Sequence, residues 1–131
     1  MFTTEPLWLG PPSRPLAGWL TRPDSACTAS GVLILPSIGY EYWSTHRTVR
    51  VLAESLATAG YTALRLDYDG TGDSAGTSWD PNRLQAWRDS ADAGAAALRD
   101  VGVERLCVLG VQFGGLLALF GAGGPADGVA V

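Results

Sequence analysis

Three short, predominantly apolar runs alternate with two longer amphipathic segments, and this alternation constrains the fold of the 131-residue chain more than any other feature. The apolar runs span residues 31–35, 61–66 and 105–109. Their length and composition predict strands that are covered on both faces. Parallel strands joined by right-handed helical crossovers explain this order. We therefore expect an α/β fold with a mostly parallel, twisted sheet and helices on both faces.

The limits of the helices are predicted from capping residues. We expect the first helix to start at an N-cap of Ser44 or Thr45 and to end at Gly60. The Asp80-Pro81 pair predicts the start of the second helix, which should end near residue 102. A short third helix should run from a tight turn at residues 110–115 to residue 120. Residues 7–10 and 17–22 predict an edge pair, and residues 128–131 predict a further strand.

Charge and composition exclude several classes of function. The formal net charge is −4, and all nine basic residues are arginines, so we expect no nucleic-acid partner and no chemistry that needs a lysine. Cys27 and Cys107 are far apart and lack metal-ligand spacing, so no metal site is expected. We find no leader sequence and no apolar segment long enough to span a membrane, and we expect a cytoplasmic protein.

Three loops follow the carboxyl ends of the expected strands, where α/β proteins bind their ligands. Their sequences are Leu-Pro-Ser-Ile-Gly at 35–39, Asp-Tyr-Asp-Gly-Thr-Gly-Asp-Ser at 67–74 and Gly-Val-Gln-Phe-Gly at 110–114. In this order they resemble the N-terminal half of an α/β-hydrolase. The resemblance is to the serine-hydrolase branch that includes S33-type aminopeptidases, lysophospholipase-like enzymes and exosortase-associated hydrolases.

The resemblance implies a role for several residues of these loops. The turn at 110–114 matches the nucleophile elbow G-x-S-x-G, with Gln112 at the position of the serine. The backbone N–H groups of Ile38 and Phe113 would be the donors that bind an oxyanion. The loop at 67–74 would be a structural turn near the pocket. The remaining pocket candidates are Ser37, Gly39, Tyr40 and His46.

Two departures from the family pattern point to a chain that is inactive by itself. A carboxamide at position 112 cannot act as the attacking nucleophile. The family places its acid and its histidine after the elbow, whereas residues 115–131 contain only Asp127 and no histidine. His46 is the only histidine, and it precedes the elbow. We therefore interpret residues 1–131 as one partial α/β-hydrolase domain, by descent an ester, thioester or peptide hydrolase.

A second interpretation is a noncatalytic ligand-binding or subunit module that uses the same cleft. Its ligand would be a small acyl-type molecule, which the Gln112 carboxamide and the two backbone N–H groups could bind. No cofactor is expected, because the glycine-rich stretch at 70–75 is separated from the next helix. A half fold exposes an unpaired sheet edge, so we also expect self-association or a complementing C-terminal half.

Overall fold

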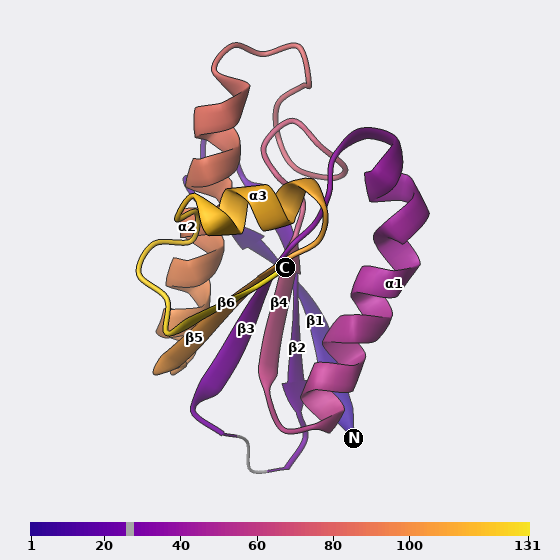
Figure 1. The fold of residues 1–131 in the computed structure, drawn as a ribbon, viewed down its shortest axis with the longest axis vertical. Coiled ribbons are helices and arrows are strands. Elements are labelled where there is room, and N and C mark those ends of the chain that lie inside the picture. Colours follow the sequence, from indigo (N-terminus) through magenta and orange to yellow (C-terminus); the bar gives the residue numbers. More distant parts are fainter. Residues whose placement is uncertain (26–27) are drawn as a thin grey trace.

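A twisted sheet of six strands forms the centre of the computed structural model, which describes residues 1–25 and 28–131 (Figure 1). Cys27 lies outside the described residues. The strands lie side by side in the order β1-β2-β4-β3-β5-β6. Their bounds are β1 (Phe2–Leu9), β2 (Leu16–Pro23), β3 (Ser30–Leu35), β4 (Thr62–Leu66), β5 (Arg105–Gly110) and β6 (Gly128–Ala130).

The sheet combines a parallel part with an antiparallel hairpin. β3 lies between β4 and β5 and is parallel to both, and β6 continues the parallel part beside β5. β2 joins β4 in antiparallel orientation, and β1 forms the outer strand of the hairpin. The expected edge pair is therefore confirmed, although both of its strands are longer than their apolar residues suggest. Strands β3 and β4 are buried almost throughout, as their predominantly apolar sequences predict, and the burial of β4 includes Thr62 and Arg65.

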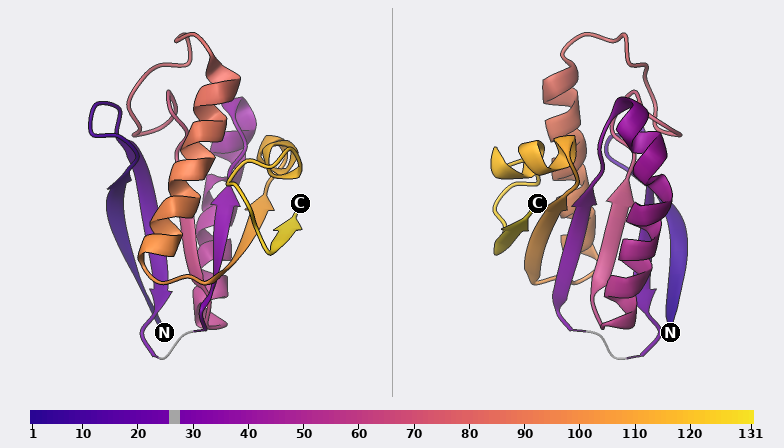
Figure 2. Two further views of the ribbon diagram at one scale, coloured as in Figure 1. Left: turned by 90° about the vertical axis from the view of Figure 1, so that its left-hand side faces the viewer. Right: turned by 45° about the vertical axis from the view of Figure 1, so that its right-hand side comes forward.

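Helices cover both faces of the sheet, as predicted (Figure 2). α1 (Gly39–Thr58) packs on one face, where Val49 and Ala53 meet Val32 and Ile34 of β3. α2 (Arg83–Asp100) and α3 (Phe113–Leu119) cover the opposite face, together with a larger apolar core. Within the described part of the chain, no helix is both long enough and apolar enough to cross a membrane.

The first helix starts earlier than its sequence predicts, so the N-cap expected at Ser44 or Thr45 is wrong. α1 begins at Gly39, directly after Ile38. Gly39 has a φ of 65°, which glycine adopts without a steric cost and which turns the chain sharply from the loop into the helix. The hydroxyl groups of Ser44 and Thr45 instead donate to the carbonyl of Glu41 inside the first turns.

The second helix starts later than predicted, so the N-cap expected at Asp80 is also wrong. α2 begins at Arg83, with Asn82 in the cap position. The Asp80 carboxylate accepts hydrogen bonds from the backbone N–H and the hydroxyl of Thr77, and it pairs with Arg14. These partners hold Asp80 in the loop before the helix, where it cannot cap the first turn.

Candidate functional site

A tight turn between β5 and α3 holds Gln112 in a backbone conformation that residues other than glycine rarely adopt. Its φ is 52° and its ψ is −114°. Only Gln112 and Asn82 combine a side chain with a positive φ among the described residues. Strain of this kind is typical of functional turns and persists only where surrounding contacts enforce it. The Gln112 side chain itself is exposed at the carboxyl end of β5.

Two glycines allow the chain to pass through this turn. A Cβ atom on Gly110 would overlap the backbone of Gly114, because the strand and the helix meet at this point. A Cβ atom on Gly114 would overlap the carbonyl oxygen of Leu35 at the end of β3. The spacing of the two glycines around Gln112 is therefore a steric requirement of the turn. It is the spacing that the pattern G-x-S-x-G describes.

The loop after β3 lies directly against this turn. The backbone N–H of Val111 donates to the carbonyl of Leu35 at 3.0 Å. The buried hydroxyl of Tyr68 donates to the carbonyl of Pro36 at 2.7 Å, which fixes the next residue of the loop. Ile38 and Phe113 both pack against the same apolar core. The structure thus brings the loop at 35–39 and the turn at 110–114 together, as the sequence predicts.

The backbone N–H groups of Ile38 and Phe113 are available at this junction. Among the described residues, neither group has a hydrogen-bond acceptor within range. Phe113 is the first residue of α3, where backbone N–H groups have no partner within the helix. Its ring packs edge-on against Trp87 of α2 at a centroid separation of 5.4 Å, which holds this end of the helix in place. Two donors therefore come from adjoining segments.

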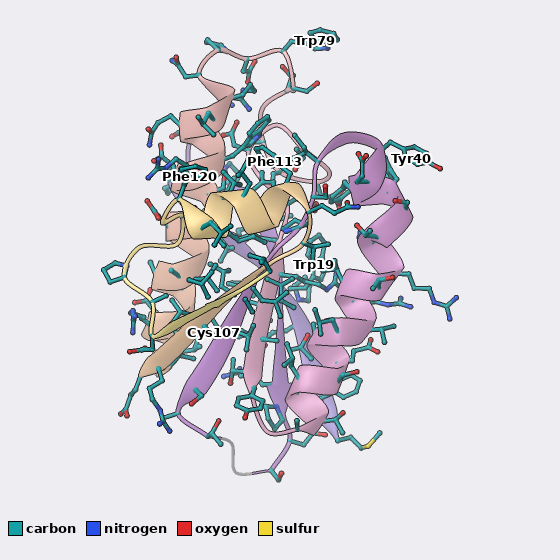
Figure 3. All side chains as sticks on the ribbon, in the orientation of Figure 1. Trp19, Tyr40, Trp79, Cys107, Phe113 and Phe120 are labelled. Atoms are coloured by element: carbon teal, nitrogen blue, oxygen red, sulfur yellow. The ribbon has the colours of Figure 1, made fainter. Side chains whose placement is uncertain are left out.

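The other pocket candidates are less closely associated with the turn. Ser37 is buried within the loop after β3, and Gly39 begins α1. Tyr40 lies on the first turn of α1, with 81% of its side chain exposed (Figure 3). His46 lies further along α1, exposed, with its ring 5.6 Å from that of Tyr42. No hydrogen bond joins His46 to Gln112 in the described part of the molecule.

Asp67 organises the loop that follows β4. Its carboxylate is buried and accepts hydrogen bonds from the hydroxyl of Tyr42 at 2.6 Å and from the backbone N–H of Asp73 at 3.0 Å. Its carbonyl accepts from the hydroxyl of Ser74, which in turn accepts from the backbone N–H of Ala17. Burial is the main cause that raises the pKa of Tyr42, and the hydrogen bond to Asp67 raises it further. The motif at 67–74 thus ties α1, β2 and β4 together.

Sequence analysis missed an ionic network beside α2. Arg14, from the turn between β1 and β2, donates two hydrogen bonds to the Asp69 carboxylate and one to Asp80. Arg83 adds a third nitrogen at 3.0 Å from Asp69. Hydrogen bonding to Arg14 is the main cause that lowers the pKa of the Asp69 and Asp80 carboxyls. The pKa of Asp80 falls to about 2. The charged residues come from distant segments without a pattern, so only the structure shows the network.

One large open cavity does not include the turn at Gln112. It has a volume of about 570 Å³ and lies beside the ionic network, with walls from the hairpin turn and the first half of α2. Three further cavities also have no wall from Gln112, Ile38 or Phe113. Groups of three or more metal-binding side chains are absent from the part of the chain that the structure describes. The turn itself is an exposed site at the rim of the sheet.

Comparison with known proteins gives a match at the level of structure. No model of a protein family matches the chain, and no curated protein sequence does. An α/β serine hydrolase without a lid from Xanthomonas campestris is similar, with a TM-score of 0.72 and 27% sequence identity over 88% of this chain and 54% of that chain. An esterase from Pyrococcus furiosus gives a TM-score of 0.70 and 24% identity, over 92% of this chain and 44% of that chain.

A further α/β serine hydrolase homologue, from Coxiella burnetii, gives a TM-score of 0.66 and 20% identity over 87% of this chain and 54% of that chain. The chain thus spans about half the length of these solved structures. The expected resemblance to α/β-hydrolases is confirmed for the fold. The finer assignment to one branch of the superfamily is not distinguished by these matches.

The ionic network predicts a dependence of stability on pH. Folding lowers the pKa of the Asp69 and Asp80 carboxyls, so both stabilise the fold at pH values above their ordinary pKa of 3.8. This contribution is lost as the pH falls toward about 2, the pKa of Asp80 in the fold. In Arg14→Gln, the free energy of unfolding should therefore fall less between pH 5 and pH 2.5 than in the original chain. Urea denaturation at a series of pH values measures the difference.

A matched control is Arg22→Gln, which removes an arginine from a half-exposed pair with Glu5 on the same hairpin. It should leave the acid-induced loss of stability close to that of the original chain. An Arg14→Gln variant with an unchanged loss of stability would contradict the role given to the network.

Proposed function

We propose that this chain is a hydrolase-fold protein of ester, thioester or peptide hydrolase descent that does not catalyse acyl transfer by itself. The finer part of the proposal places it in the serine-hydrolase branch with S33-type aminopeptidases and lysophospholipase-like enzymes. The observation that carries the proposal is the conformation of Gln112, at φ 52° in the turn between β5 and α3. This is the place where the fold would present a nucleophile.

The chemistry of the side chain supports the absence of a covalent step. A serine hydroxyl attacks after a base has removed its proton, and the tetrahedral intermediate then forms on its oxygen. A carboxamide has no proton that a histidine can remove, and its oxygen is a weak nucleophile. Gln112 can donate and accept hydrogen bonds, but it cannot form the acyl-enzyme.

The base is also missing from the neighbourhood of the turn. His46 is the only histidine of the 131 residues, and it lies on α1, exposed and without a hydrogen bond to Gln112 within the described residues. Asp127 is the only carboxylate after the turn, and it accepts a hydrogen bond from the backbone N–H of Leu106 at 2.8 Å. Neither residue has the geometry of a base held by an acid.

Reaction with a serine-directed fluorophosphonate and with 4-nitrophenyl acetate tests the proposal. The chain should show no burst of nitrophenol and no increase in mass. The Gln112→Ser variant should show little turnover, because a hydroxyl without a base remains a weak nucleophile. Circular dichroism should confirm that the variant is folded.

The His46→Ala change in the Gln112→Ser background is the matched control. It should leave the small residual rate unchanged if His46 takes no part. A fluorophosphonate adduct on any serine of the original chain would overturn the proposal. Turnover in Gln112→Ser that is lost with His46→Ala would identify His46 as a base and would overturn it equally.

A noncatalytic role in ligand binding is the second candidate, and the two N–H groups of Ile38 and Phe113 favour it. Donors without a protein acceptor are suited to the oxygen of an acyl group or a carboxylate. The Gln112 carboxamide, at the rim of the same turn, adds a third polar group.

Titration with hexanoate tests this second role. The amide signals of Ile38 and Phe113 should shift in ¹⁵N NMR spectra, with a dissociation constant in the micromolar range. Hexanol, which has the same chain length and no carboxylate, should cause much smaller shifts. The role would be excluded by equal effects of both compounds, or by no effect of either.

A further inference from the structure

Arg65 is a buried arginine on the central strand β4. Only 8% of the residue is exposed, and its neighbours along the strand, Leu64 and Leu66, are buried and apolar. None of the ion pairs among the described residues includes Arg65. Its Nε atom is buried and has no hydrogen-bond partner in the part of the chain that the structure describes. A guanidinium stays charged and donates five N–H groups, so its burial is unfavourable unless an acceptor compensates it.

Trp19 of β2 covers one face of this guanidinium. The two residues lie opposite each other in the antiparallel register of β2 and β4. The Cζ atom of Arg65 lies 4.8 Å from the centre of the indole ring, on the side of the sheet that α1 covers (Figure 3). This cation–π contact is made through the flat face of the guanidinium. The N–H groups in the plane of the guanidinium still need an acceptor.

Two carboxylates near Arg65 are engaged by other groups. Asp67 accepts hydrogen bonds from the hydroxyl of Tyr42 and from a backbone N–H. Glu54 pairs with Arg50 of the same helix at 3.9 Å. Burial and then the charge of Arg50 lower the pKa of Arg65, whereas Asp67 and Glu54 raise it. The fixed carboxylates therefore compensate the buried charge only in part.

A small cavity adjoins the guanidinium between α1 and the sheet. Its walls comprise Trp19, Pro36, Tyr42, Thr45, His46, Val49, Arg65, Leu66 and Asp67. Its volume is about 10 Å³, which is close to the space that one water-sized sphere requires. Carboxylate, phosphate and sulfate groups have several heavy atoms and do not fit this space. Strands β3 and β5 separate β4 from β6, so the cavity is remote from the last strand of the sheet.

We propose that this cavity is a binding site for one chloride ion, which accepts hydrogen bonds from the guanidinium of Arg65. A chloride ion supplies an acceptor and a negative charge together, whereas a water molecule supplies only the acceptor. The guanidinium is weakly hydrated and pairs better with chloride or bromide than with the strongly hydrated fluoride ion. Because the Asp67 carboxylate also lines the cavity and repels an anion, the dissociation constant should lie in the millimolar range.

NMR titration of the 131-residue chain with sodium chloride tests the proposal, with sodium fluoride keeping the ionic strength constant. The ¹⁵N–¹H signals of the Arg65 Nε–H group and the Trp19 indole should shift and saturate. Bromide should cause similar shifts, and sulfate should not. The indole signal of Trp79, which is 92% exposed, is the control and should stay in place. A stationary Arg65 signal, as expected for a site that holds water only, would overturn the proposal, as would equal shifts with chloride and sulfate.

The Arg65→Met variant gives a second readout, because methionine keeps an apolar stem and removes the charge. Over the same titration, chloride should raise the folding equilibrium constant of the original chain several-fold and leave that of Arg65→Met unchanged. Arg47→Met is the matched control, since Arg47 is an exposed arginine of α1 outside the cavity, and it should keep the response to chloride.

An equal response to chloride in Arg65→Met and in the original chain would contradict the proposal. The NMR titration needs no variant, so it decides the proposal even where Arg65→Met does not fold. These outcomes do not depend on whether the turn at Gln112 binds a ligand.

Discussion

The backbone of Gln112 is confined by contacts on both sides, and the arrangement of the candidate site depends on this confinement. Gly110 and Gly114 let β5 and α3 approach so closely that no side chain fits between them. Gly114 also lies directly against the carbonyl of Leu35, which places the loop after β3 beside the turn. The chain therefore passes through position 112 with a positive φ, although the residue there is not a glycine.

The backbone conformation of this turn and the reactivity of the Gln112 side chain are two separate properties. Under the proposed function, the strained turn and the N–H groups of Ile38 and Phe113 would be the parts of the fold that position a substrate and bind an oxyanion. The side chain at the centre of the turn is an amide, which cannot attack a carbonyl. The proposed function therefore rests on a turn with the geometry of an elbow and on a side chain that lacks the reactivity of a serine.

The sequence predicted the strands and the adjacency of the loops because these follow from local patterns. Buried apolar runs such as residues 31–35 leave few alternatives to a central strand, and parallel strands bring their carboxyl ends to one edge. The helix starts were predicted poorly. Ser44, Thr45 and Asp80 are good capping residues, but contacts with Glu41, Thr77 and Arg14 decided where they lie. Of these partners only Arg14 is distant in the sequence, and its pairing with Asp80 is not visible in a local pattern.

The roles of single residues divide in the same way. The position of Gln112 could be predicted from two glycines and the strand before them, since the steric requirement is local. The network of Arg14, Asp69 and Arg83 could not, because its members come from three segments that only the folded sheet brings together. The exposure of His46 likewise depends on how α1 packs, and the sequence alone shows only its order along the chain.

The strain at position 112 is the most direct test of this account. The Gln112→Gly and Gln112→Ala variants should be compared by urea denaturation, because both remove the exposed side chain and only glycine relieves the positive φ. Relief of such strain exceeds the entropic cost of glycine, so Gln112→Gly should be more stable than Gln112→Ala by about 1 kcal/mol. A Gln112→Gly variant that is equally stable or less stable would show that residue 112 does not occupy a strained elbow, and would contradict the assignment of the site.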